Sequence, residues 1–120
     1  MSVGIKRIYE NASEDDGARF LVDRLWPRGV SKARAQLDGW LKDAAPSPAL
    51  CAWFAHKPEN FETFSGQYRR ELETDAAKQA AVRRILDAAA AGRVTLVYAA
   101  RDERINHAAV LLTYLLEKAG

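Results

Sequence analysis

Three short runs of apolar and β-branched residues divide the chain and predict three strands. Residues 5–9 read Ile-Lys-Arg-Ile-Tyr, and residues 19–23 read Arg-Phe-Leu-Val-Asp. The clearest run is residues 93–99, Arg-Val-Thr-Leu-Val-Tyr-Ala, which follows Gly92 and ends at a charged turn. A continuous apolar run of this kind is typical of a strand that is covered on both faces.

Apolar residues at helical spacing predict four helices between the second and third strands and one helix after the third. Ser31 is the expected cap of the first, which continues past Leu37 to Trp40 and Leu41 and ends at the proline-rich residues 45–48. The fourth is expected to end with Gly92 in a left-handed conformation. The other helices are expected to begin at Ser47, Pro58, Asp75 and Asp102. In chain order, the residues expected to face the core are Leu50 and Phe54 in the first of these helices, Phe61, Phe64, Tyr68 and Leu72 in the second, Val82 and Ile85 in the third, and Ala108, Leu111 and Leu115 in the last.

Strands separated by helices indicate an α/β fold with a small, parallel-type sheet of about three strands and helices packed around it. We expect residues 1–120 to form one domain, with the second and third strands parallel because the chain between them is a helical crossover. Ligands of such folds gather beyond the carboxyl ends of the strands. Here those ends are residues 23–29 and 98–102, both rich in polar side chains, and parallel strands would bring them together at one sheet edge. We therefore expect Arg24 and Arg28 to converge with the end of the third strand on one concave site.

The composition narrows the class of protein. The chain has 120 residues, 48% hydrophobic and 28% charged, with a formal net charge of +2. The only cysteine, Cys51, excludes an internal disulfide and is expected to be a small buried residue; with two histidines it forms no metal-ligand pattern. The apolar runs are too short to span a membrane, so we expect a cytoplasmic location without a membrane partner. No cofactor-binding motif is present, so the sequence does not identify a cofactor.

The first polar cluster lies in the basic segment, residues 19–34, which has a net charge of +4. Free backbone N–H groups where a helix begins attract anions, and arginine binds phosphate or carboxylate in a bidentate manner. The alternative is that these charges are solvated or pair with nearby aspartates. The candidate anion-binding residues are Arg24, Arg28, Gly29 and Lys32.

Two further residues of this loop have open roles. Asp23 is a candidate general base or hydroxyl acceptor, kept ionised by Arg24 or Arg28; alternatively, it only buttresses an arginine. Trp26 either stacks on a planar ligand or fills the core.

A second polar cluster follows the third strand. It contains Tyr98, Arg101, Asp102, Asn106 and His107, of which His107 is a candidate catalytic proton shuttle. The positive end of the helix dipole would keep that imidazole neutral near pH 7. The alternative is that Asn106 and His107 complete the cap of the last helix.

The sequence from Leu21 to Lys32, LVDRLWPRGVSK, resembles the YeaO-like branch of the domain of unknown function 488 family. The likeness continues through Trp40-Leu41-Lys42, residues 53–56 and residues 94–99 to Asn106. It implies a compact, cytoplasmic bacterial α/β domain and brings no reaction with it. Wider relatives carry a Cys-His pair at the position of Asn106-His107, which supports a role for His107.

The sequence leaves three functions open. The first is a site for a small anionic molecule of the nucleotide or sugar-phosphate type at the strand ends, with catalysis left open. The second is a nucleic-acid-binding or transcription-related module that uses the basic segment, and the third is a stress-related interaction protein without chemistry. The acidic residues 10–16 argue against sequence-specific DNA as a partner, and the oligomeric state is not fixed by the sequence.

Overall fold

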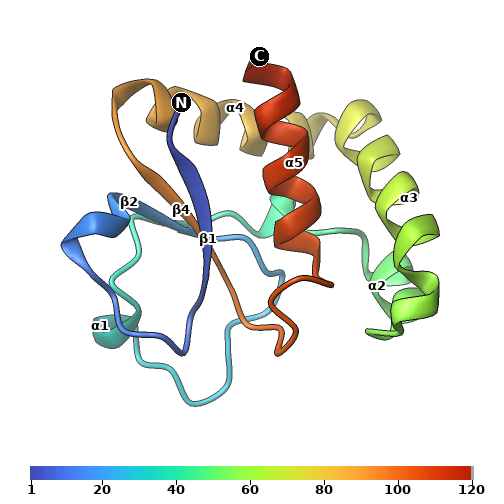
Figure 1. Ribbon diagram of the computed structural model, residues 1–120, viewed down its shortest axis with the longest axis horizontal. Helices are drawn as coiled ribbons and strands as arrows, with labels where there is room; N and C mark the ends of the chain where they lie inside the picture. The colour runs from blue at the N-terminus through green and yellow to red at the C-terminus, as the bar shows by residue number, and fades with distance from the viewer. Residues whose placement is uncertain (120) are drawn as a thin grey trace.

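A computed structural model, which describes residues 1–119, has a four-stranded sheet in the order β1-β4-β2-β3 (Figure 1). The strands are β1 (Val3–Arg7), β2 (Ala18–Leu21), β3 (Gly39–Trp40) and β4 (Val94–Tyr98). Every pairing is parallel, and Ala18 to Leu21 lie opposite Val94 to Val97. The α/β class and the parallel arrangement of β2 and β4 are therefore confirmed, and the sheet has one strand more than expected.

The fourth strand, β3, replaces most of the first predicted helix. Helix α1 spans only Lys32–Ala35 and ends at Gln36, whose φ of 48° is left-handed. The next residues then pair with β2, because the Asp38 N–H donates to the Arg19 carbonyl and the Leu41 N–H to the Leu21 carbonyl, each at 2.8 Å. Backbone pairing with an open sheet edge thus prevails over the helical spacing.

The remaining helices are α2 (Pro48–Phe54), α3 (Phe61–Thr74), α4 (Ala76–Ala91) and α5 (His107–Ala119). Single turns of 3-10 helix occur at Glu14–Asp16, Lys42–Ala44 and Pro58–Asn60. The predicted caps hold for α2 and α4, since the Ser47 hydroxyl accepts from the Leu50 N–H and the Asp75 carboxylate from two amides. Gly92 differs from expectation, because its φ of 167° is extended and needs no glycine.

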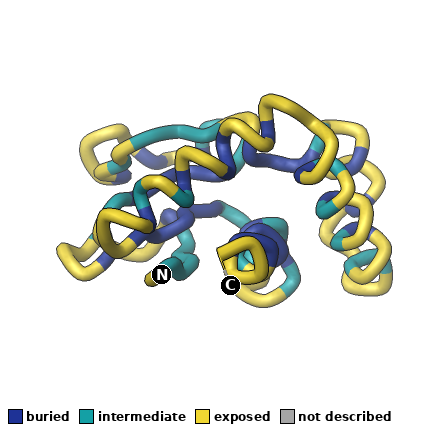
Figure 2. Tube along the Cα trace, turned by 90° about the horizontal axis from the view of Figure 1, so that it is seen from above, coloured by how far each residue is buried: buried dark blue, intermediate teal, exposed yellow. Residues whose placement is uncertain are grey.

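The two faces of the sheet are covered differently. In Figure 1, α3 and α5 lie to the right of the strands and α1 to their left. The larger core includes Phe20, Leu96, Tyr68 and Leu111 on the α2–α5 side, and Figure 2 shows buried residues along the strands and the inner faces of these helices. The opposite face has a smaller core around Leu21, Val97 and the loop residues that follow β2.

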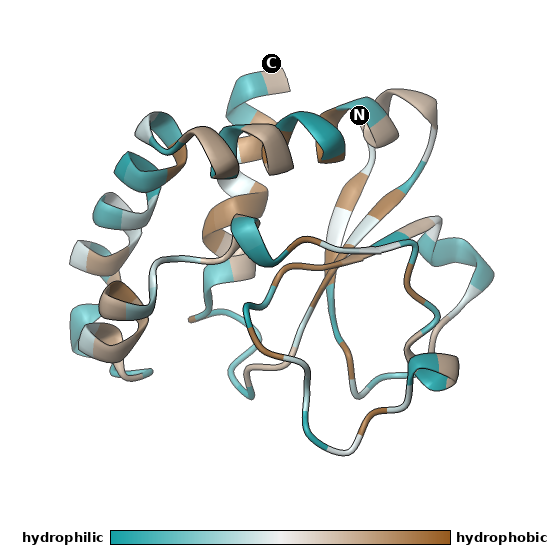
Figure 3. Ribbon diagram, turned by 180° about the vertical axis from the view of Figure 1, so that it is seen from behind, coloured by the Kyte–Doolittle hydropathy of each residue, from teal (hydrophilic) through white to brown (hydrophobic). Residues whose placement is uncertain are grey.

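The chain between β2 and α1 crosses the end of the sheet without regular structure. In Figure 3 it alternates between hydrophobic and hydrophilic stretches, as expected of a loop whose apolar residues reach the smaller core. This loop and residues 99–106 both leave the carboxyl ends of adjacent parallel strands. The expectation that the two polar segments meet at one sheet edge is thereby confirmed. Among residues 1–119, no helix is long and apolar enough to cross a membrane.

Candidate functional site

A cavity of about 930 Å³ lies at the carboxyl ends of β2 and β4. This volume lies within the usual range of small-molecule sites, about 300–1,000 Å³. One wall is polar and comes from residues 23–25, residues 99–102 and the start of α5. The other is largely apolar and comes from residues 45–48, α2 and α3, and it contains Ala45, Pro46, Pro48, Cys51, Phe54 and Phe64, with His56 beside them.

The structure brings half of the predicted site residues into this cavity. Five of them line it, from three separate parts of the chain: Asp23, Arg24, Asp102, Asn106 and His107. The other five lie outside its lining: Trp26, Arg28, Gly29, Lys32 and Tyr98.

Asp23 joins the ends of the two strands. Its Oδ2 accepts a hydrogen bond of 3.0 Å from the Ala99 N–H, and its Oδ1 lies 3.0 Å from Nε2 of His107. The expected arginine partner is not found, because within residues 1–119 no Arg or Lys nitrogen lies within 4.0 Å of this carboxylate. Backbone geometry is the reason, since the loop directs Arg24 away from its neighbour and toward residues 45 and 46.

His107 occupies the first turn of α5, and its side chain reaches back to the end of β2. Nε2 lies 3.1 Å from the Val22 carbonyl oxygen, and this contact has hydrogen-bond geometry. The Asp23 carboxylate on the other side is also an acceptor, and its buried Oδ1 has no hydrogen-bond donor among the described residues. Because both neighbours of Nε2 accept, the proton of a neutral His107 belongs on Nε2, and Nδ1 is left as the free ring nitrogen.

Arg24 places a positive charge on the cavity wall. Its Nη2 donates to the carbonyl oxygens of Pro46 at 3.2 Å and Ala45 at 3.4 Å, while its buried Nε has no acceptor within residues 1–119. The same residues contain no carboxylate within 4.0 Å of the guanidinium. Neutral carbonyl groups fix the side chain and leave its charge uncompensated at short range.

Asp102 and Asn106 shape the loop before α5. Asp102 Oδ1 accepts from the N–H groups of Ile105 and Arg104, both at 2.8 Å, and these bonds lower the pKa of that carboxyl. Asn106, not Asp102, caps the helix: its Oδ1 accepts from the Ala109 N–H, and its Nδ2 donates to the Asp102 carbonyl. Asn106 is buried, so both ends of its amide serve the fold.

The five other candidates support the surroundings of the cavity. Trp26 packs edge-on to Trp40 at 5.3 Å and donates from Nε1 to Val30, so it belongs to the smaller core. Tyr98 is buried in the larger core. Arg28, Gly29 and Lys32 are exposed, and Gly29 has a left-handed φ of 77°. The predicted convergence of both loop arginines on one concave site is therefore not found, because the chain turns outward after Trp26.

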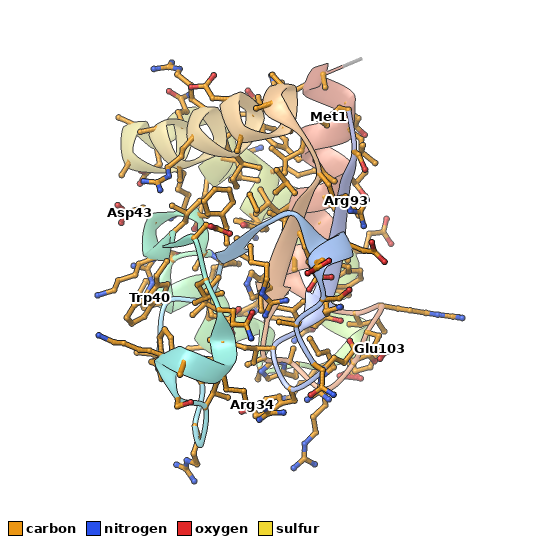
Figure 4. The ribbon with its side chains drawn as sticks, turned by 90° about the vertical axis from the view of Figure 1, so that its left-hand side faces the viewer. Met1, Arg34, Trp40, Asp43, Arg93 and Glu103 are labelled. Atoms are coloured by element: carbon orange, nitrogen blue, oxygen red, sulfur yellow. The ribbon has the colours of Figure 1, made fainter. Side chains whose placement is uncertain are left out.

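The basic segment does not form one charged surface. Arg19 is buried, with Nη1 2.7 Å from Asp16 Oδ2 and two further hydrogen bonds to the Ala35 carbonyl. Arg34 donates to the Tyr9 carbonyl and, with Trp40, lies on the side that carries α1 (Figure 4). Counting charges along the sequence therefore overstates the positive charge available to a partner.

The apolar wall is the part of the site that sequence reasoning missed. Phe54 and Phe64 stack with ring centroids 4.2 Å apart, and both were assigned only to the core. Cys51, expected to be buried, is an exposed residue whose thiol lines the cavity, because the neighbouring Leu50 and Phe54 take the inward face of α2. Partial burial raises the pKa of that thiol. The helical spacing of apolar residues identifies the inward face of a helix, but it does not show which part of that face borders a cavity.

No group of three or more His, Cys, Asp and Glu side chains that could hold a metal ion occurs within residues 1–119. Of the charged side chains that line the cavity, Arg24 and Arg101 have no carboxylate within 4.0 Å among residues 1–119.

Comparisons with known proteins identify relatives along nearly the whole chain. The family model DUF488-N3i, described as the inactive DUF488-N3 subclade, matches residues 2–119. The uncharacterized protein YeaO of Escherichia coli K12 is 40% identical over 115 residues, which cover 96% of this chain and 97% of the relative. The uncharacterized protein Rv3073c of Mycobacterium tuberculosis H37Rv is 42% identical over 113 residues, covering 94% and 92%. No solved structure matches the chain.

Proposed function

The chain belongs to the DUF488-N3i family, and from this premise we propose that the cavity beyond β2 and β4 binds a small organic anion and does not convert it. The family description, an inactive subclade, favours binding over turnover. The position of the cavity also favours binding, since ligands of parallel α/β sheets gather at the carboxyl ends of the strands. Asp23 and His107, the two candidate catalytic residues, act here as binding and positioning residues.

The observation that carries the proposal is the environment of Arg24. Its guanidinium lies on the cavity wall with two carbonyl acceptors and without a short-range counter-ion among residues 1–119. A partly buried charge that lacks a counter-ion is costly, and an anionic ligand supplies one. The carboxylate of Asp102 does not compete for this role, because it accepts from the backbone of its own turn.

His107 gives the site a second polar contact. With its Nε2 held between Val22 and Asp23, the ring is fixed in orientation and presents Nδ1 as its remaining polar atom. Neutral Nδ1 accepts a hydrogen bond, so it suits a ligand N–H or O–H group beside the anionic end. Asp23 acts through His107 and through the Ala99 amide, and thus sets the shape of both strand ends.

The test is a ¹H–¹⁵N NMR titration of the protein with three anions: adenosine 5′-monophosphate, ribose 5-phosphate and naphthalene-2-carboxylate. At least one should shift the amide signals of residues 99–102 and His107 in a saturable manner. Arg24→Ala should weaken this binding at least about tenfold, whereas Arg28→Ala, which removes an exposed arginine outside the cavity, should leave it unchanged. If none of the three shifts the cavity amides at millimolar concentration, or if Arg28→Ala has the same effect as Arg24→Ala, the proposal is refuted.

A further inference from the structure

The cavity offers few polar atoms that are not already used by the protein. Asn106 has both ends of its side-chain amide bonded, Asp102 Oδ1 accepts two backbone N–H groups, and Asp23 Oδ2 is taken by Ala99. The carbonyl oxygens of Ala45 and Pro46 face Arg24. The groups that the polar wall leaves to a ligand include the guanidinium groups of Arg24 and Arg101, the buried Asp23 Oδ1, which has no hydrogen-bond donor among residues 1–119, and the second ring nitrogen of His107.

A sugar ring fits this inventory poorly. Ribose or a hexose brings several hydroxyl groups, each of which donates and accepts hydrogen bonds in water. A hydroxyl that enters a cavity without finding partners loses its bonds to water and weakens binding. Specific polyol sites avoid this cost by supplying a partner for each hydroxyl, whereas the apolar wall of this cavity supplies the side chains of Pro46, Pro48, Phe54 and Phe64.

The apolar wall matches an aromatic body. The rings of Phe54 and Phe64 are nearly parallel, at 18°, and both residues line the cavity, although they are only 5% and 1% exposed and belong mainly to the larger core. At the rim, Leu25 is 78% exposed, an unusual state for a leucine that sits between the anchored Arg24 and Trp26. A ligand ring that covers Leu25 would remove this apolar surface from water, which is favourable in proportion to the area covered.

Resting on the proposed function, we infer that the ligand is an aromatic monocarboxylate. Its carboxylate pairs with the Arg24 guanidinium, and its ring lies against the apolar wall and the exposed Leu25. A sugar phosphate, with its many hydroxyls, is the poorer ligand. The sequence alone favoured a nucleotide or a sugar phosphate, so this inference changes the expected class of ligand.

Isothermal titration calorimetry with three probes tests the ligand class. Naphthalene-2-carboxylate carries both features, naphthalene-2-carboxamide keeps the ring and lacks the charge, and ribose 5-phosphate keeps an anion and lacks the ring. We expect the carboxylate to bind about 10- to 100-fold more tightly than the amide, the range given by a hydrogen bond to a charged group. It should also bind at least about tenfold more tightly than ribose 5-phosphate.

Two variants test which residues bind the carboxylate and the aromatic ring of the probes. Arg24→Ala should reduce affinity for the carboxylate to that for the amide and leave the amide unchanged. Leu25→Ser, at an exposed position that does not threaten folding, should weaken both naphthalene probes several-fold and spare ribose 5-phosphate. Arg28→Ala is the matched control and should change nothing.

The outcomes separate the two proposals. If ribose 5-phosphate or adenosine 5′-monophosphate binds the cavity through Arg24 more tightly than the naphthalene carboxylate, the ligand class is wrong and the proposed anion site stands. If the amide binds as tightly as the carboxylate, the pairing with Arg24 is wrong. If no probe binds, both proposals are refuted.

Discussion

Asp16 should contribute more to stability than any exposed carboxylate of the same loop. It is only 6% exposed, and its oxygens lie 2.7 Å from Lys6 Nζ and 2.7 Å from Arg19 Nη1, with a third bond from the Ser13 N–H at 3.0 Å. Arg19 is itself buried at 3% exposure. Asp16→Asn leaves that guanidinium in the interior without its counter-ion.

Removing one partner of a buried ion pair costs about 3–5 kcal/mol, because the remaining charge is neither solvated nor paired. The asparagine retains one oxygen acceptor and Arg19 retains the Ala35 carbonyl, so we expect the lower end, about 3 kcal/mol. A chain of 120 residues has a stability of about 6–18 kcal/mol, so the change is large. Asp15→Asn, at the exposed neighbouring position, is the control and should change stability by less than about 0.5 kcal/mol.

The assay is urea unfolding followed by circular dichroism at several pH values. Burial alone would raise the pKa of Asp16, but hydrogen bonds from Lys6, the Ser13 amide and Arg19 lower it below its usual value. A lowered pKa contributes stability that is complete above the unfolded-state value, about 4, and is lost as the pH falls through the folded-state value. The difference between wild type and Asp16→Asn should therefore be full at pH 7 and shrink below about pH 4. Equal stabilities of Asp16→Asn and Asp15→Asn at pH 7 would refute the reasoning.

Two further predictions concern the start of α5. Asn106→Ala should lower the free energy of unfolding by about 1–2 kcal/mol in the same assay, because the helix loses its cap. Asn106→Ser should recover part of this loss. An alanine variant as stable as wild type would contradict the capping role. In ¹⁵N NMR spectra of the neutral imidazole, His107 should show Nε2 as the protonated nitrogen, since Val22 and Asp23 both offer acceptors there; a predominant Nδ1–H form would show that the ring does not bind these groups.

The sequence predicted the parts of the fold whose signal is long or continuous. The buried run of β4 and the aromatic stripe of α3 are such signals, and both elements lie where expected. β3 has only two residues, Gly39 and Trp40, and no periodicity can be read from two positions. Its formation depends on the free edge of β2, a tertiary feature that prevails over the helical spacing of Leu37 and Leu41.

The sequence predicted the polar half of the candidate site and not its apolar wall. Asp23 and His107 lie 84 positions apart in the chain and meet because β2 and β4 are adjacent, which the parallel-sheet rule anticipates. Arg28 was grouped with Arg24 by spacing alone, and the turn at Trp26 and Gly29 separates them. Arg19 likewise looked like part of a binding surface, although it is buried in β2 and paired with Asp16.

The most direct test of an anion site at Arg24 uses Cys51, the chain's only cysteine, whose thiol lines the same cavity. Iodoacetate and iodoacetamide alkylate a thiol by the same displacement and differ in charge, so the ratio of their rates reports the attraction of an anion to the cavity and cancels the reactivity of the thiol. Arg24→Ala should lower the ratio of the iodoacetate rate to the iodoacetamide rate about fivefold, the effect of about 1 kcal/mol between unit charges, and Arg28→Ala should leave it unchanged. A ratio that is the same in wild type and Arg24→Ala would contradict the anion site.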